Sequence, residues 1–408
     1  MNLLILALRN VLRNRRRSLA TIAAVAAGLA AVNLFGGYIA NVYAGLQMQA
    51  VAGERLGHLT IYKKGMLTLG KLKPKKYMFD AAETERVQQA LRELPSVKLV
   101  SPRLSISGIA SNGKASTIFI GEGVVAEHAD ALRGSLPEGT GGRLQPGMRY
   151  GLAVSSELAQ MLQFKQGDAL TLMTSTIDGQ ANAMDAQIVD IFNTGNTNTN
   201  DKYLIAPVAF AQSLVDTSSA ERFVVLLDDV DKTEVARIEI ARRLASAGFD
   251  VEIKTWKELS SFYTSVRNLF DMIFGFIASI VFVVAAMSIA NTMAMAVVER
   301  TREIGTLQAM GMKRRGIVGL FLAEGLWLAA IGVLAGLAAT LVAAFAVNQA
   351  GISYVPPNSS YAVLLLVDLD WPRIAVVGTV VVLLALASAL LPAWRGARRD
   401  IVDALAFA

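Results

Sequence analysis

Four long apolar stretches constrain this chain more than any other feature of its sequence. They cover residues 18–44, 266–298, 316–348 and 373–392 and are rich in Ala, Val, Leu, Ile and Gly. A helix needs about 20 apolar residues to cross the roughly 30 Å hydrocarbon core of a bilayer. The sequence therefore predicts an α-helical membrane protein with four transmembrane helices.

The distribution of Arg and Lys predicts how these helices are oriented. Basic residues cluster before the first stretch, between the second and third, and after the fourth, whereas the segment 349–372 has none. Because short cytoplasmic loops carry the excess of Lys and Arg, we expect both termini and residues 299–315 in the cytoplasm. Residues 349–372 then form an external loop, residues 393–408 a cytoplasmic tail, and residues 45–265 an external domain.

The first 44 residues could be confused with a cleaved signal peptide, because basic residues precede the apolar run. That run exceeds the usual 7–15 residues of a signal-peptide core, so we expect an uncleaved anchor. Residues 1–17 are predicted to form an amphipathic helix on the cytoplasmic surface, since apolar residues alternate there with Arg9 and Arg13 at helical spacing.

Composition excludes several other classes of protein. The net charge of +6 comes from basic clusters that flank apolar runs, which is typical of membrane anchoring and not of nucleic-acid binding. The chain has no cysteine, so disulfides and thiol chemistry are excluded. His58 and His128 are expected to be isolated surface residues. We therefore expect no catalytic residue, metal site or cofactor in this chain.

Residues 45–265 have the pattern of a separate α+β domain, because charged residues return and apolar runs shorten to strand length. Residues 46–100 and 220–258 are expected to form one βαβ-type layer, and the strand-rich segment 101–218 an inserted subdomain. The last helix is expected to start near Trp256 and to continue unbroken into the second transmembrane helix.

One segment of this domain nearly fits a phosphate-binding loop. Residues 108–115 read Gly-Ile-Ala-Ser-Asn-Gly-Lys-Ala, but Ala115 replaces the hydroxyl residue that binds Mg²⁺, and a strand follows where a helix is required. An Asn112-Gly113 hairpin turn is the better interpretation.

Two polar residues lie within the predicted membrane helices. Placing a charged side chain such as that of Glu324 at the centre of a membrane helix costs roughly 2.5–3.5 kcal/mol of insertion free energy. Glu324 could contact a proton or substrate, but an interhelical hydrogen bond that fixes packing is the favoured interpretation. Asn291 is expected to act in a similar way.

The segment 299–315 is predicted to form a short cytoplasmic helix that ends at a glycine C-cap. A charged loop that only satisfies the orientation rule is the simpler alternative. However, the segment has an Ile/Leu stripe that we expect to be exposed and to dock into a groove on a partner. The residues assigned to this docking site, called the coupling site below, are Glu299, Arg300, Arg302, Glu303, Ile304, Gly305, Leu307, Gln308 and Gly311.

The same segment resembles the coupling helix of FtsX-type ABC permeases, the superfamily that includes MacB, LolC/LolE and FtsX. Residues 299–311 read Glu-Arg-Thr-Arg-Glu-Ile-Gly-Thr-Leu-Gln-Ala-Met-Gly, and residues 321–325 and 391–400 are also similar to the family. Residues 7–17 and 57–62 resemble the LolC/LolE branch more than the others.

The resemblance implies a bacterial inner-membrane permease that works as a homo- or heterodimer. A separate ABC ATPase subunit would bind ATP and Mg and push on the coupling helix, which would transmit motion mechanically to the external domain. Extraction or export of lipophilic or lipidated cargo is the preferred function, with membrane lipid and a periplasmic carrier as partners. MacB-like efflux with a membrane-fusion protein and FtsX-like control of a cell-wall hydrolase are the alternatives.

Overall fold

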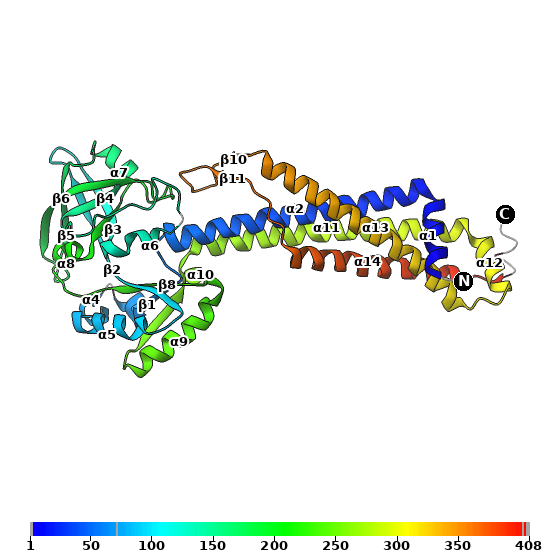
Figure 1. Ribbon diagram of the computed structural model, residues 1–408, viewed down its shortest axis with the longest axis horizontal. Coiled ribbons are helices and arrows are strands. Elements are labelled where there is room, and N and C mark those ends of the chain that lie inside the picture. Colours follow the sequence, from blue (N-terminus) through cyan, green and yellow to red (C-terminus); the bar gives the residue numbers. More distant parts are fainter. Residues whose placement is uncertain (1–2, 71, 135, 402–403, 405–408) are drawn as a thin grey trace. The chain divides into compact units, whose positions relative to one another are not determined.

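The computed structural model describes residues 3–70, 72–134, 136–401 and 404, and it divides the chain into two compact units. The helical unit consists of residues 1–43, 267–353 and 364–408. The α+β unit consists of residues 44–266 and 354–363. Figure 1 labels the elements of both units.

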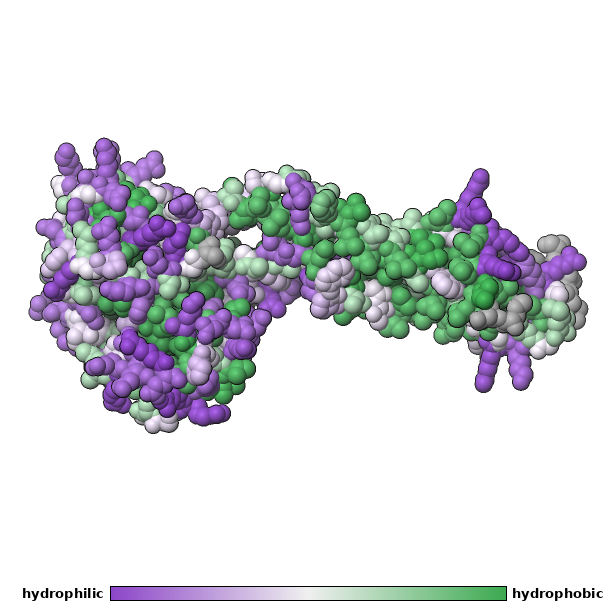
Figure 2. Space-filling model, in the orientation of Figure 1, coloured by the Kyte–Doolittle hydropathy of each residue, from purple (hydrophilic) through white to green (hydrophobic). Residues whose placement is uncertain are grey.

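Four helices are long and apolar enough to cross a membrane, as expected. They are α2 (Arg15–Met48, extended by the π-helical turn η1 at Gln49–Gly53), α11 (Ser261–Glu299), α13 (Arg314–Gln349) and α14 (Trp371–Ala397). Two shorter helices accompany them, α1 (Leu3–Arg13) and α12 (Thr301–Ala309). The surface of the helical unit is largely hydrophobic, whereas hydrophilic residues dominate the surface of the α+β unit (Figure 2).

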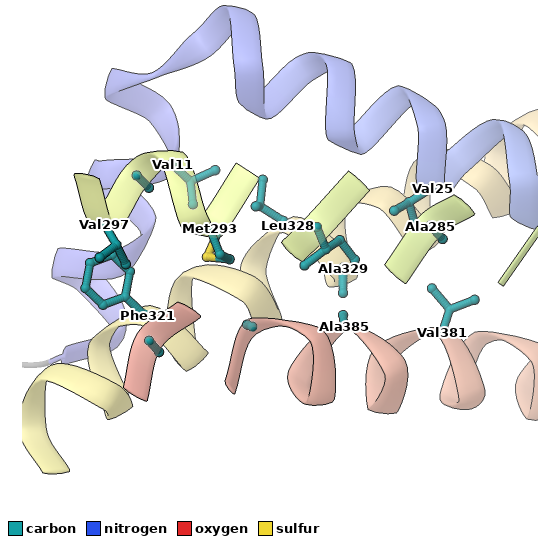
Figure 3. Packing of buried hydrophobic residues seen from close by; sticks show 14 of the residues in the cluster. Val11, Val25, Ala285, Met293, Val297, Phe321, Leu328, Ala329, Val381 and Ala385 are labelled. Carbon is teal, nitrogen blue, oxygen red and sulfur yellow. The ribbon is translucent and has the colours of Figure 1, made fainter. Parts of the chain in front are cut away.

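The helical unit is held together by small and branched apolar side chains. Ala329 of α13 and Ala385 of α14 are fully buried, beside Val25 of α2 and Ala285 of α11 (Figure 3). Glycines allow neighbouring helices to approach most closely. A Cβ added at Gly332 of α13 would lie 2.7 Å from a methyl carbon of Val25 of α2. Lipid tails are as apolar as these side chains, so close van der Waals packing stabilises the bundle.

The connection from the α+β unit into α11 differs from the expectation of one unbroken helix. Helix α10 (Trp256–Leu259) begins at a capping box in which Thr255 and Glu258 satisfy each other's backbone N–H groups. It then ends at Ser260, whose extended backbone (φ −82°, ψ 91°) precedes the start of α11 at Ser261. Trp256 is buried against Tyr263, with ring centroids 4.7 Å apart, so the two rings pack together across the break.

One part of the α+β unit is a four-stranded antiparallel layer. Its strands occur in the order β2 (Val97–Ser111), β8 (Arg222–Leu227), β1 (Leu59–Lys63) and β9 (Val251–Thr255). Helix α5 (Ala81–Arg92) connects β1 to β2 and α9 (Thr233–Ser246) connects β8 to β9, which is the split βαβ arrangement. The apolar faces of both helices share one core with the strands.

The other part is a ring of six strands that closes upon itself. Strand β2 continues from the layer and pairs with β3 (Ser116–Val124) and β5 (Ala169–Ser175). The remaining pairings close the ring through β7 (Tyr203–Pro207), β4 (Gly151–Ser155) and β6 (Ala181–Phe192). A closed ring removes exposed strand edges. Helices α6 (Ala129–Arg133), α7 (Ser156–Met161) and α8 (Val208–Leu214) lie between these strands in sequence.

The ring and the layer have separate hydrophobic cores, and Met78, which precedes the ring strands in sequence, belongs to the core of the ring. Several short elements complete the unit: α3 (Met66–Leu69), α4 (Pro74–Tyr77), η2 (Ala126–His128) and η3 (Val230–Lys232). Strands β10 (Ser353–Tyr354) and β11 (Val363–Leu364) flank the segment 354–363, where Asn358 accepts a hydrogen bond from Thr197 at 3.1 Å.

The segment that nearly fits a phosphate-binding loop is a hairpin, as expected. It joins β2 to β3 through Gly113, which has a φ of +82°, and the Asn112 side chain accepts the backbone N–H groups of Lys114 and Ala115. The two histidines differ from the expectation of surface residues. Both are half-buried, which lowers their pKa, and His58 Nδ1 accepts the Leu227 N–H at 2.8 Å.

Candidate functional site

The candidate functional site is the end of the helical unit that contains α1 and α12. Helix α11 ends at Glu299, and Arg300 leaves the helical conformation (φ −108°, ψ 19°) before α12 begins. At the other end of α12, Gly311 has a φ of +92° and its N–H donates to the Gln308 carbonyl, while the Met312 N–H donates to Leu307. These two hydrogen bonds form the expected glycine C-cap.

The apolar stripe of α12 is not exposed, so that expectation is wrong. Ile304 is only 4% exposed and packs in the core of the helical unit, and Gly305 beside it is also buried. Leu307 packs beside Ala7 of α1, and Gln308 Nε2 donates to the Ala397 carbonyl at 3.0 Å. The stripe is covered because α1, α13 and α14 offer it an apolar surface within the same chain.

A different face of α12 is exposed. Met310 is the most exposed of its apolar residues, at 72%. With helical spacing, residues 302, 306, 309 and 310 lie along one side. The exposed residues of this face, named the outer face of α12 below, are Arg302, Glu303, Thr306, Ala309 and Met310.

Glu324 lies at the centre of a buried hydrogen-bonded network. Its side chain is 4% exposed and accepts hydrogen bonds from Arg300 Nη1 at 2.7 Å and from Asn10 Nδ2 at 2.6 Å. Arg300 comes from the junction of α11 and α12, and Asn10 comes from α1. Glu324 of α13 therefore connects three other elements, which supports the interpretation that it fixes helix packing.

The network continues to the surface through Glu303. Its carboxylate accepts hydrogen bonds from Arg300 Nε and from Arg13 Nη2, both at 2.7 Å. Burial would raise the pKa of Glu303, but the hydrogen bonds from Arg13 and Arg300 outweigh that effect and lower it. Arg17 makes a comparable ion pair with Glu299. The carboxylate of Glu303 is thus held in its ionised form between α1 and the start of α12.

Asn291 does not have the expected role within this chain. It is exposed on α11, and the neighbouring Thr292 makes the interhelical contact instead: the hydroxyls of Thr292 and Thr21 lie 2.6 Å apart and are buried. The sequence pattern did not predict Asn10 and Arg13 as partners of this site. Asn10 and Arg13 are three residues apart on an amphipathic helix and therefore lie on one face, which could have indicated that they contact the same neighbour.

Two family models match this chain. Residues 275–401 match the family model described as FtsX-like permease C-terminal, and residues 18–243 match the model described as MacB-like periplasmic core domain. These two segments include α12 and most of both units, but not α1. The chain belongs to the MacB/FtsX-type permeases of ABC transporters, also called type VII.

Individual relatives come from more than one branch of this family. The chain is 22% identical over 303 residues to a lipoprotein-releasing system transmembrane protein LolC from Xylella fastidiosa, which covers 70% of this chain and 72% of the relative. It is 30% identical over 176 residues to the pyoverdine export ATP-binding/permease protein PvdT from Pseudomonas putida, covering 43% of this chain. It is 32% identical over 129 residues to the macrolide export ATP-binding/permease protein MacB from Hyphomonas neptunium, covering 31% of this chain.

The chain spans only 25% of the length of that PvdT and 20% of that MacB. Among solved structures, the periplasmic region of MacB from Actinobacillus actinomycetemcomitans matches 50% of this chain and 91% of its own, with 14% identity and a TM-score of 0.36.

We predict that the Arg300–Glu324 pair is a main determinant of the stability of the helical unit. Arg300→Gln should destabilise the purified full chain by about 3–5 kcal/mol, because it leaves the Glu324 carboxylate buried without its charge partner. Glu324→Gln should cost less, since Arg300 keeps Glu303. The double variant should be more stable than Arg300→Gln alone. Thermal unfolding in detergent measures all three.

Arg16→Gln is the matched control, because Arg16 is exposed near the same end of the unit. A melting temperature of Arg300→Gln equal to that of Arg16→Gln would show that the network does not stabilise the chain.

Proposed function

We propose that this chain is a permease subunit that receives force from a separate ABC ATPase subunit through α12 and passes it to the α+β unit. The observation that carries the proposal is that α12 has one face anchored in its own helical unit and another face exposed. Arg300 and Ile304 anchor it, and the outer face remains available to a partner. A force on the outer face would therefore move α11 and α13 together with α12.

The proposed orientation places this site in the cytoplasm of a bacterial inner-membrane protein. Basic residues flank both ends of α12 and both chain termini, and Lys and Arg are absent from residues 349–372. That asymmetry favours cytoplasmic termini and a periplasmic α+β unit. An ATPase, which needs cytoplasmic ATP, would then meet α12 directly.

A separate ATPase subunit is supported by the nature of this chain's phosphate-loop-like segment. It is the exposed β2–β3 hairpin and no helix follows it, so it has no helix N-terminus to hold phosphates. In the proposed complex, ATP and Mg are bound by the ATPase. The coupling residues of this chain then have no catalytic role, and the chain is not an enzyme.

The outer face of α12 is expected to dock into the ATPase through Met310. Met310→Asp should lower the amount of ATPase that co-purifies with the permease by about tenfold or more, because a charge replaces an apolar anchor at an interface. The amount of permease in the membrane should not change, since Met310 makes few contacts within its own chain. Quantitative affinity purification from membranes measures both.

Met161→Asp is the matched control, because Met161 is another exposed methionine, on α7 of the α+β unit. If both variants retained the ATPase equally, the outer face of α12 would not be the docking site.

A second permease copy is supported by the exposed side of α11. This helix is the least buried of the four membrane helices, and its exposed residues recur at helical spacing. Asn291 lies among them, and a polar side chain facing lipid is unfavourable. The exposed residues that form this stripe include Phe276, Ile280, Val284, Met287, Asn291 and Met295.

Because the chain has no cysteine, Met287→Cys introduces a single reactive thiol in the middle of the stripe. A photoreactive maleimide attached there should crosslink in membranes to a second permease, and the mass of the product distinguishes an identical copy from a different one. Phe345→Cys, on the exposed side of α13, should give much less product. Absence of a permease crosslink from Cys at 287 would contradict the proposed dimer interface.

We propose lipophilic or lipidated cargo, released towards a periplasmic carrier. The similarity to LolC, which extends over 70% of this chain, supports it. So does an apolar row across three neighbouring strands of the ring, where Ile109 pairs with both Ile118 and Met173. All three side chains are exposed, Ile118 at 65%. MacB-like export with a membrane-fusion protein and FtsX-like control of a hydrolase remain the alternative functions.

The protein that contacts this apolar row would show which branch of the permease family the chain resembles in function. A photoreactive amino acid at position 118 in cells should crosslink to a lipoprotein or its carrier, whereas an adaptor or a hydrolase would favour one of the alternatives. The same amino acid at Val235, an exposed position on α9 of the layer, is the control. Identical products from both positions would mean that the apolar row has no specific partner.

A further inference from the structure

A group of charged side chains is buried where β2 passes from the four-stranded layer into the ring. Arg103 of β2 is fully buried, and it lies opposite Arg222 in the register with β8. Glu122 of β3 faces both: its Oε1 is 3.2 Å from Arg103 Nη1, and its Oε2 accepts a hydrogen bond from Arg222 Nη2 at 3.2 Å. A third guanidinium comes from Arg55, whose Nε is 3.7 Å from the same Oε1.

The positive charge in this group exceeds the negative charge. Three guanidiniums face Glu122, and among the described residues the one further carboxylate with a direct contact is Glu221, which pairs with Arg222 at 2.9 Å. One buried cation is therefore uncompensated, which is unfavourable in a medium of low dielectric constant. Burial lowers the pKa of Arg103, and Glu122 opposes this shift only in part. Arginine does not deprotonate in proteins, so the excess charge persists.

Several hydrogen-bond donors of the group are also without partners. In the described part of the chain, Nε and Nη2 of Arg103 and Nη1 of Arg55 have no hydrogen-bond partner, and Nη1 of Arg103 has only the ion-pair contact with Glu122. Arg55 is 3% exposed, so water does not reach it freely. Buried donors are nearly always satisfied in stable proteins, and an unexplained set of them indicates a missing water or ion.

A pocket of about 250 Å³ adjoins this group. It is far larger than one water needs, roughly 10–15 Å³, and slightly below the usual 300–1,000 Å³ of drug-sized ligand sites. Its size therefore suits a small ligand. The pocket is lined by Arg55 and Tyr203 together with Gln49, Gly53, Glu54, Phe192, Thr194, Asn196 and Thr199.

The lining provides donors and little competing negative charge. Tyr203 begins β7, and its burial raises the pKa of the phenol, which keeps the hydroxyl protonated and able to donate. Glu54 is the one carboxyl group among the lining residues. Burial raises its pKa, and a hydrogen bond with Ser260 opposes this only in part.

We propose that this pocket binds a phosphate-type oxyanion, held directly by Arg55 and Tyr203 and attracted by the buried charge of Arg103. A guanidinium fork matches the geometry of phosphate oxygens and forms strong charge-assisted hydrogen bonds with them. Free phosphate and the phosphodiester of a lipid headgroup share this chemistry. The site is independent of the proposed coupling through α12.

The proposal is tested by titrating inorganic phosphate into the delipidated full chain in detergent, at constant ionic strength set with sodium chloride. We expect saturable binding by calorimetry and a rise in melting temperature with phosphate but not with chloride. Arg55→Gln should weaken phosphate affinity by about tenfold or more, because it removes a charge-assisted hydrogen bond. Arg242→Gln, which removes an exposed guanidinium from α9, should have no effect.

Two milder variants keep the test decisive if Arg55→Gln does not fold. Tyr203→Phe removes only a hydroxyl, and Asn196→Ala only an amide, and each should weaken phosphate binding. Phosphate binding that is absent from the parent, or equal in the parent and all folded variants, would overturn the proposal and leave the charges as a purely structural junction.

The source of the oxyanion is distinguished by a second ligand. Water-soluble dihexanoyl phosphatidylglycerol should compete with phosphate for the same site. A lower half-saturating concentration for this lipid than for phosphate would identify a headgroup site. A lower half-saturating concentration for phosphate would identify a site for the free ion. Both results support an oxyanion site, whereas binding of either ligand that Arg55→Gln leaves unchanged contradicts it.

Discussion

The ion pair between Arg300 and Glu324 is the interaction on which the arrangement of the helical unit depends. A carboxylate within a membrane helix is unfavourable unless it is paired, and here one guanidinium and one amide satisfy it at 2.7 and 2.6 Å. These partners belong to separate elements, so both hydrogen bonds form only when α1, the end of α11 and α13 come together. Helix α12 begins at Arg300, and its position is set by the same contacts.

This dependence changes the expected role of the apolar stripe of α12. An exposed Ile/Leu stripe would have been a docking surface, yet Ile304 is buried and serves as the anchor of α12 to its own chain. The residues assigned to coupling thus divide between the anchor and the outer face. A helix that is fixed on one side transmits displacement better than one that is free on both. The helix is interrupted at Ser260, so the continuous segment begins only at Ser261, where α11 starts.

In the α+β unit, strand β2 has a comparable role. It pairs with β8 in the layer and with β3 and β5 in the ring, so one strand belongs to both parts. Arg103 lies at the point of transition, where it is fully buried beside Glu122. A junction built from buried charges is costly unless each charge is compensated. The proposed oxyanion would supply the missing compensation and would link ligand binding to the geometry of the two parts.

The sequence by itself determined the four membrane helices, because the hydrocarbon core requires long apolar runs. It also determined the glycine cap of α12 and the hairpin at Asn112-Gly113, since both depend on local backbone chemistry. Only the tertiary structure decided that Ile304 is covered, that Thr292 and not Asn291 bridges two helices, and that Asn10 reaches Glu324. The sequence did not predict the buried charged group around Arg103, because its members are far apart in the sequence, from Arg55 to Arg222. Periodicity shows which side of an element is apolar, but it does not show which surface, if any, the rest of the chain brings to cover it.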